Sequence, residues 1–391
     1  MLDKKCFLGI VFCVCIISII SGVSFPAEAI KIGVAGPLSG GLAPYGIPTV
    51  RAAELVVNKI NSQGGALGNN VEIITGDDAC VPASATNIAT QFVNQGVDVV
   101  LGHICSSATL AALETYKNAE IVVMSPASSN PELTQSGDYP NFFRTIAPDN
   151  VQARLIVDYA LNILKVSKIA VVHDNQAYGK GIAELAKGYI EADTRATVVL
   201  YESITPGLMD YSNEVQNINQ SNAEAAIYCG YHPEASKIIT KMREMNMDTI
   251  FISDDAVKDD SFIFAAGNNA EGAYASAPKD LSNISMYQLA VEEHVQAYGE
   301  EPGAYFPQAY AATMALLNAI KNAGSTDQEA VSEALRSKFL LTPLGRISFD
   351  EKGDAIGVGF SMYKVINGEF VEVYVGKIII SMPSVPFLLL D

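Results

Sequence analysis

Residues 97–125, VDVVLGHICSSATLAALETYKNAEIVVMS, decide the fold class. The apolar run Val97–Leu101 is followed by a helical pattern over Ser107–Tyr116 and then by a second apolar run, Ile121–Ser125. Two short apolar strands joined by a helix are typical of a βαβ unit, because parallel strands need a long crossover connection. The stretch therefore predicts a parallel sheet covered by helices on both faces.

The same rhythm precedes this unit. Strands are expected at Ile30–Leu38 and Val71–Thr75, and helices at Thr49–Ser62 and from Pro82 to Gly96. Proline at the start of the second helix and glycine just past its end mark both of its limits. Residues 30–125 thus predict three consecutive strand–helix units in one α/β lobe.

The rhythm pauses over Ala127–Asn150, which is rich in Ser, Asn and Pro, and then restarts. Two similar series separated by a polar interval predict two Rossmann-like lobes with parallel sheets. The second series has expected strands at Lys168–His173, Thr197–Tyr201, Ala225–Tyr228 and Thr249–Ile252, and expected helices at Gly179–Glu191, Tyr211–Gln220 and Pro233–Met245.

Later segments connect the lobes. Gly272–Ala277 and Arg346–Phe349 are expected to be strands that leave one lobe and enter the other, with helices at Ser285–Tyr298 and Ala304–Ala323 between them. Three crossings form a three-stranded hinge, which lets the lobes close without unfolding. The crossings are expected near Thr145–Ala147, Ala275–Ala277 and Ile347–Phe349. The first lobe is then residues 30–146 and 277–348, and the second lobe residues 147–276 and 349–374.

The first residues have the features of a secretory signal peptide. Lys4 and Lys5 precede the apolar stretch Cys6–Val23, and Ala27-Glu28-Ala29 predicts cleavage after residue 29. An uncleaved membrane anchor is the alternative, because the stretch approaches spanning length. Lipidation at Cys13 or Cys15 is disfavoured, since neither follows a small residue. The apolar tail, residues 375–391, is too short and broken for a membrane span, and its role stays open.

Composition limits the partners. The chain has 391 residues, enough for two domains, and a formal net charge of −18 with no run of Lys or Arg. Such a surface repels nucleic acid, so no nucleic-acid partner is expected. Cleavage after residue 29 would leave Cys80, Cys105 and Cys229, and an exported chain can form a disulfide. A bridge between Cys80 and Cys105, which both follow strands, would close about 26 residues and contribute roughly 3 kcal/mol.

No motif for catalysis is present in the sequence. It contains no G-x-S-x-G, Walker A, G-x-G-x-x-G or H-E-x-x-H pattern, and its four histidines lack ligand-like spacing. Asp77-Asp78 is interpreted as a solvated strand end rather than a catalytic pair. We therefore expect no enzyme activity, no metal and no cofactor.

Polar loops follow several of the expected strands, which is where open α/β sheets bind ligands. Gly102–Ser107 leads into a helix whose N-terminus suits a carboxylate. Pro126–Ser129 follows the next strand and offers a carbonyl and hydroxyls. Asp254-Asp255, in the second lobe, offers a carboxylate for an ammonium group. Donors on one lobe and an acceptor on the other would clamp a zwitterion when the lobes close.

With these loops the chain resembles the leucine/isoleucine/valine-binding proteins of branched-chain amino-acid ABC transporters, which have the type I periplasmic-binding-protein fold. The resemblance implies a monomeric, periplasmic, non-enzymatic protein that captures a free amino acid and delivers it to a membrane ABC permease. A receptor ectodomain of the same fold is the alternative, and it would need a retained anchor or a signalling domain. The matching segments are Gly36–Gly40 with Tyr45-Gly46, Asp77–Cys80, Gly102–Ser107, Pro126-Ala127 with Pro131–Leu133, Val172–Asp174 with Tyr178-Gly179, Gly230–Glu234 and Asp350–Asp354.

The resemblance also implies roles for individual residues. Ser106 would hold the ligand carboxylate, and Ser129, where the family usually has Thr, would supply a second hydroxyl. The Ala127 carbonyl and Asp255 would accept from the ammonium group. The other positions implied are Tyr45 on the first lobe, Tyr178 and Tyr231 on the second, Ile104, Cys105 and Tyr305 around the ligand side chain, and a disulfide between Cys80 and Cys105.

Two positions depart from the family. Asp255 stands where the relatives carry Glu, so closure is tighter, a water intervenes, or the ligand sits differently. Tyr305 replaces Phe, which places a hydroxyl near the side-chain pocket or in solvent. The expected ligand is therefore an amino acid, and a branched-chain amino acid is a narrower expectation within that class.

Overall fold

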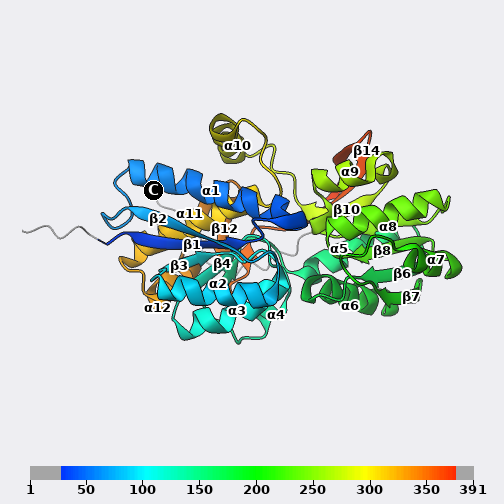
Figure 1. The fold of residues 1–391 in the computed structure, drawn as a ribbon, viewed down its shortest axis with the longest axis horizontal. Coiled ribbons are helices and arrows are strands. Elements are labelled where there is room, and N and C mark those ends of the chain that lie inside the picture. Colours follow the sequence, from blue (N-terminus) through cyan, green and yellow to red (C-terminus); the bar gives the residue numbers. More distant parts are fainter. Residues whose placement is uncertain (1–27, 376–391) are drawn as a thin grey trace, which may run out of the picture.

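The computed structural model describes residues 28–375, arranged as two α/β lobes side by side (Figure 1). The expected signal peptide and apolar tail lie outside the described residues, apart from residues 28, 29 and 375. None of the helices within residues 28–375 is long and apolar enough to cross a membrane.

The first lobe is built on a five-stranded sheet in the order β2-β1-β3-β4-β5, with every neighbouring pair parallel. Its strands are β1 (Ile30–Gly36), β2 (Val71–Asp77), β3 (Val99–Leu101), β4 (Val122–Ser125) and β5 (Phe142–Arg144). Its helices are α1 (Ala43–Ser62), α2 (Pro82–Asn94), α3 (Ser106–Asn118), α4 (Glu132–Gln135), α10 (Ser285–Tyr298), α11 (Phe306–Ala323) and α12 (Gln328–Ser337), with the 3-10 turn η1 (Gly40–Leu42).

Successive apolar side chains of the central strands point to opposite faces of this sheet, which explains why helices cover both faces. Val100 and Val123 pack with apolar residues of α2 and α3, whereas Leu101 and Met124 pack with α1 and α11. Successive side chains of a strand point to opposite faces, so a strand that is apolar throughout needs cover on both sides.

The second lobe contains a seven-stranded sheet in the order β15-β14-β10-β9-β8-β6-β7. The pairs from β10 to β7 are parallel, but β10, β14 and β15 pair antiparallel, so the sheet is mixed rather than purely parallel as expected. Its strands are β6 (Lys168–His173), β7 (Thr197–Ser203), β8 (Ala225–Cys229), β9 (Ile250–Ser253), β10 (Tyr274–Pro278), β14 (Phe360–Ile366) and β15 (Glu369–Val375). Its helices are α5 (Asp149–Asn162), α6 (Ala177–Glu191), α7 (Ser212–Gln220), α8 (His232–Glu244) and α9 (Asp260–Ala266), with the 3-10 turns η2 (Asp255–Val257) and η3 (Gly267–Ala270).

Three connections join the lobes. They run between β5 and α5, between β10 and α10, and between β13 (Ala355–Ile356) and β14. Residues of all three, including Ala147, Lys279 and Val358, line one cavity of about 240 Å³, so the connections lie together.

The third connection lies later than the expected crossing near Ile347–Phe349. Strand β12 (Gly345–Phe349) pairs with β11 (Leu340–Thr342) and β13 in a small antiparallel sheet. The ring of Phe349 packs against Phe143 of the first lobe, with centroids 5.6 Å apart. This small sheet keeps the chain on the first lobe until residue 356.

Helix α5 was missed by the sequence reasoning, which treated residues up to Asn150 as a polar interval. Its buried residues Ala153, Ile156 and Ala160 recur at helical spacing, so the signal was present. The two-lobed α/β fold itself is confirmed, and the elements of the second series from β6 to β9 lie within two residues of their expected limits.

Candidate functional site

Two loops at the carboxyl ends of β3 and β4 bring Ser106 and Ser129 together. Ser106 is the first residue of α3, and its Oγ accepts a hydrogen bond of 3.3 Å from the backbone N–H of Asn130. Ser106 and Ser129 are both buried. The first N–H groups of a helix have no partner within it, so this corner suits an anionic group.

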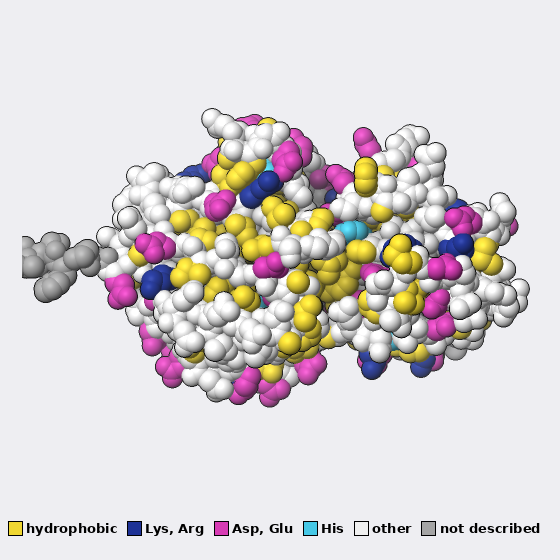
Figure 2. Space-filling view, in the orientation of Figure 1, with side chains coloured by type: hydrophobic (Ala, Val, Ile, Leu, Met, Phe, Trp, Pro, Cys, Tyr) yellow, Lys and Arg dark blue, Asp and Glu magenta, His cyan; other side chains and the backbone are white. Residues whose placement is uncertain are grey.

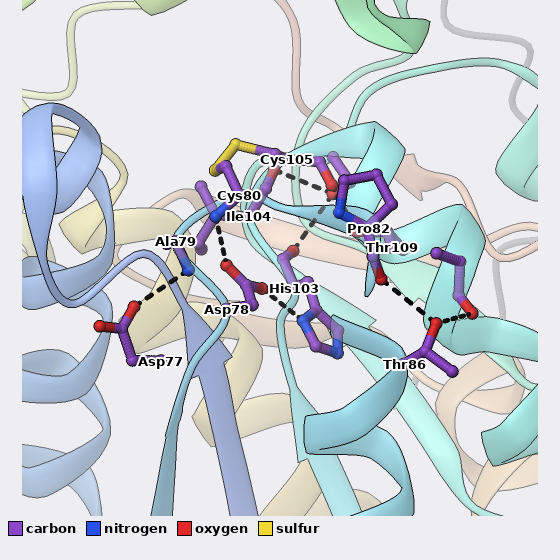
Figure 3. Close-up of polar contacts among 12 residues, drawn as sticks. Asp77, Asp78, Ala79, Cys80, Pro82, Thr86, His103, Ile104, Cys105 and Thr109 are labelled. Carbon is purple, nitrogen blue, oxygen red and sulfur yellow. Dashed lines mark hydrogen bonds and ion pairs between the residues drawn. A yellow bond between two sulfur atoms is a disulfide. The ribbon is translucent and has the colours of Figure 1, made fainter. Parts of the chain in front are cut away.

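A disulfide holds the Ser106 loop. Cys80, after β2, is bonded to Cys105, which immediately precedes Ser106, and their Cα atoms are 5.5 Å apart (Figure 3). The expected pairing is confirmed. The bridge links the loops of two strands, β2 and β3, so it restricts movement of the residues that precede α3.

A buried polar pair supports the same loop from beneath (Figure 3). Nδ1 of His103 lies 2.5 Å from Oδ2 of Asp78, and both residues are fully buried. The other oxygen of Asp78 accepts the Cys80 N–H at 2.7 Å. The carbonyl of His103 accepts hydrogen bonds from the hydroxyls of Ser125 and Ser128. Asp78 is therefore a structural anchor of the loop, not the solvated strand end that was expected.

Asp255 lies on the second lobe, in the 3-10 turn η2, and is 3% exposed. Its Oδ1 accepts hydrogen bonds from the Tyr178 hydroxyl at 2.5 Å and from Gln152 Nε2 at 2.6 Å, and its Oδ2 accepts one from the Tyr305 hydroxyl at 2.9 Å. Burial raises the pKa of Asp255, and these three donors oppose that rise by stabilising the ionised form.

Four tyrosines join the lobes around this carboxylate. The centroid of the Tyr45 ring lies 5.7 Å from that of Tyr305 and 6.2 Å from that of Tyr231. The ring centroids of Tyr178 and Tyr231 are 5.5 Å apart. The Tyr45 hydroxyl bonds His232 Nδ1 at 2.5 Å and donates to the Ala256 carbonyl, both across the junction. Figure 2 shows hydrophobic side chains gathered where the lobes meet.

Seven of the ten expected ligand contacts line one cavity of about 10 Å³. A cavity of that volume holds about one water molecule, so in this closed conformation the tyrosines fill the space between the lobes. The cavity is lined by Tyr45, Ile104, Ser106, Ala127, Tyr178, Tyr231, Ala256 and Tyr305.

The remaining three expected residues lie beside this cavity rather than on its wall. Asp255 lines a neighbouring cavity of about 470 Å³, and Tyr305 lines both. Ser106 and Asp255 thus line different cavities here. Ser129 is fully buried, and Cys105 is in the disulfide.

Sequence reasoning did not select Gln152, His232 or Ala256, although all three contact residues that it did select. Gln152 lies on the missed helix α5, while His232 and Ala256 directly follow Tyr231 and Asp255. Adjacency to a selected residue was the only signal for His232 and Ala256, and Gln152 had no such signal. Within residues 28–375, no group of three or more His, Cys, Asp or Glu side chains is arranged to hold a metal ion.

Comparison with known proteins places this arrangement in a family. The sequence pattern of the family described as periplasmic binding protein matches residues 29–369. The leucine-, isoleucine-, valine-, threonine- and alanine-binding protein of Pseudomonas aeruginosa is 32% identical over 341 residues, covering 87% of this chain and 91% of that protein. The Leu/Ile/Val-binding protein of Escherichia coli K12 is 34% identical over 338 residues, covering 86% and 91%.

Several solved structures have the same fold as this chain. The branched-chain amino-acid transporter substrate-binding protein of Streptococcus pneumoniae, in complex with isoleucine, has a TM-score of 0.78 and 26% identity, covering 88% of this chain and all of that one. A leucine-binding protein of Thermotoga maritima has a TM-score of 0.82 at 24% identity, covering 88% and 98%. The chain belongs to the periplasmic binding protein family.

Proposed function

We propose that this protein captures a free amino acid with a branched aliphatic side chain between its lobes and delivers it to a membrane ABC permease. The relatives named for leucine, isoleucine and valine, matched over nearly their whole length, support the ligand class. Binding, not catalysis, is the activity of a periplasmic binding protein.

The observation that supports this proposal most is that a corner suited to an anion and a carboxylate suited to a cation lie on different lobes. Ser106, at the N-terminus of α3, belongs to the first lobe and is suited to a carboxylate. Asp255 belongs to the second lobe and is suited to an ammonium group. A zwitterion that meets both needs the lobes closed, which couples binding to closure. Asp255, Ser129, the Ala127 carbonyl and the four tyrosines are proposed ligand contacts, with Ile104, Cys105 and Tyr305 around the side chain.

The first lobe is proposed as residues 30–146 with 277–356 and the second as residues 147–276 with 357–374, because β12 and β13 hold the chain on the first lobe beyond the expected boundary at residue 348. The loop at Asp350–Asp354 also contacts the first lobe, since Arg144 Nε donates to Asp354 Oδ1 at 2.6 Å. We further propose that the protein works as a monomer in the periplasm, reached through an N-terminal signal peptide cleaved after residue 29. The acidic character of the chain, with 43 Asp and Glu against 25 Lys and Arg, supports solubility there.

A thermal-shift screen against the twenty common amino acids tests this function. A ligand present at about 100 times its dissociation constant stabilises the folded state by roughly 2.7 kcal/mol. Leucine, isoleucine or valine should raise the melting temperature most. Stabilisation by none of the twenty would overturn the proposal.

A further inference from the structure

Asn130, in the loop between β4 and α4, makes a hydrogen bond across the junction of the lobes, and neither end of this bond is a proposed ligand contact. Its side-chain Nδ2 donates to the carbonyl of Ala177 at 2.7 Å. Ala177 is the first residue of α6, on the second lobe, whereas Asn130 belongs to the first. Figure 1 shows α4 and α6 on facing sides of the junction. This bond can therefore form only when the lobes have closed.

The first lobe holds Asn130 in place through three other hydrogen bonds. Its Oδ1 accepts the Glu132 N–H at 2.9 Å, and its own N–H donates to Ser106 Oγ at 3.3 Å. Its carbonyl accepts from the Arg144 guanidinium at 2.8 Å. Asn130 is also buried. Because these bonds orient the amide toward the second lobe, little conformational entropy is lost when it meets α6.

Helix α6 is shaped to receive this amide. In an α-helix the Ala177 carbonyl accepts the N–H of Gly181, and its second lone pair remains for Asn130. A Cβ atom at Gly181 would lie 3.0 Å from Asn130 Nδ2, closer than ordinary van der Waals contact. Glycine inside a helix is less favourable than alanine. Residue 181 thus gives up helix stability at the point where the amide approaches.

We propose that Asn130 is a positioning residue for lobe closure, whose amide, seated on Ala177 and Gly181 of α6, stabilises the closed form and slows release of the ligand. The inference rests on the proposed function and extends it to the rate of release. A ligand enters and leaves while the lobes are apart. A bond present only in the closed form therefore lowers the dissociation rate and leaves the association rate nearly unchanged.

The position of Asn130 allows closure to be changed without changing the contacts to the ligand. The bond from Tyr305 to Asp255 also crosses the junction, but both of its ends are proposed ligand contacts. A substitution at either end alters binding and closure together. Asn130, Ala177 and Gly181 are not among the residues that line the small cavity between the lobes. A substitution at Asn130 or Gly181 thus isolates the contribution of closure.

Stopped-flow measurement of leucine association and dissociation tests the inference with Asn130→Ala, Gly181→Ala and the double variant. Asn130→Ala should raise the dissociation rate by about three- to tenfold, because one neutral hydrogen bond is lost, and should change the association rate by less than about twofold. Gly181→Ala should raise the dissociation rate by about twofold or more, because its Cβ displaces the amide. In the Asn130→Ala background, Gly181→Ala should have no further effect.

Melting temperatures of the ligand-free proteins separate this role from a general loss of stability. Gly181→Ala should keep or raise the melting temperature while it speeds dissociation, since alanine favours the helix. Gly188→Ala is the matched control on the same helix, because a Cβ atom there would meet nothing within 4 Å beyond its own helical turn. This control should leave both rates unchanged.

A wild-type dissociation rate in folded Asn130→Ala would overturn the inference and leave the proposed function intact. The inference also fails if Gly181→Ala speeds dissociation equally with and without the Asn130 side chain. If Asn130→Ala does not fold, Gly181→Ala decides alone, and a dissociation rate equal to that of Gly188→Ala would contradict the inference. No binding of any amino acid by wild type would overturn the proposed function and this extension of it together.

Discussion

The hydroxyl of Tyr305, on the first lobe, donates a 2.9 Å hydrogen bond to Oδ2 of Asp255, on the second. The two positions that the resemblance leads us to expect as departures from the family are thus in direct contact across the junction. The hydroxyl that a Phe would lack meets a carboxylate that is one methylene shorter than Glu. We interpret the two changes as a matched pair, in which the tyrosine orients the shorter side chain.

Tyr305→Phe should therefore weaken leucine binding by about tenfold, because a hydrogen bond to a charged group contributes about 1.5 kcal/mol or more. Calorimetric dissociation constants measure the effect. Tyr298→Phe is the matched control, since its hydroxyl bonds Glu54 away from the junction at 2.7 Å. An unchanged dissociation constant in Tyr305→Phe would show that the hydroxyl does not support Asp255.

Loss of the Cys80–Cys105 disulfide should lower the free energy of unfolding by about 3 kcal/mol, because the bridge restricts the unfolded chain. Chemical denaturation of the Cys80→Ser/Cys105→Ser variant measures this loss. Thiol counting is an independent check. The protein without its first 29 residues should show one thiol after denaturation, that of buried Cys229, and three thiols would contradict the bridge.

Asp354→Ala should lower the free energy of unfolding by about 3–5 kcal/mol, since it leaves a buried guanidinium without its partner. The Arg144 side chain is 0% exposed, and its Nε lies 2.6 Å from Asp354 Oδ1. The exposed pair between Arg154 and Asp158 is the control, and Asp158→Ala should cost less than about 1 kcal/mol. Similar losses in the two variants would mean that the buried pair does not anchor this loop.

Asp174→Asn should gain stability relative to wild type as the pH rises from 5 to 8. Burial raises the pKa of Asp174 to about 7, so the folded protein binds a proton that the unfolded chain has already released above its ordinary pKa near 4. Wild-type stability is then lost as the pH rises through 7. The Asn side chain keeps the acceptor for the Gln176 N–H. Melting temperatures of both proteins at pH 5 and 8 measure the difference, and a constant difference would contradict the assignment.

Sequence patterns predicted most of the fold because the central strands are apolar on both faces, as in Val99–Leu101, and such strands fit only between helices. The antiparallel edge at β14 and β15 was not predicted. Its alternating exposed and half-buried residues, Glu369–Val375, lie in a segment that carries no strand–helix rhythm.

Side-chain partners were harder to predict than elements. The carboxylates Asp78 and Asp149 look like ordinary surface acids in the sequence, and only folding shows that both are fully buried. Asp78 is paired with His103, 25 residues later, through a contact that no local pattern encodes. Asp149 was overlooked because it begins the helix that was not predicted.

The most direct test of the account is the affinity of Asp255→Ala for leucine, measured by calorimetry beside wild type. Wild type should bind with a dissociation constant near 1 μM or below, about −8 kcal/mol, and the variant should remain folded but show no binding. Wild-type affinity in a folded Asp255→Ala would contradict the claim that a carboxylate on the second lobe holds the ligand ammonium group.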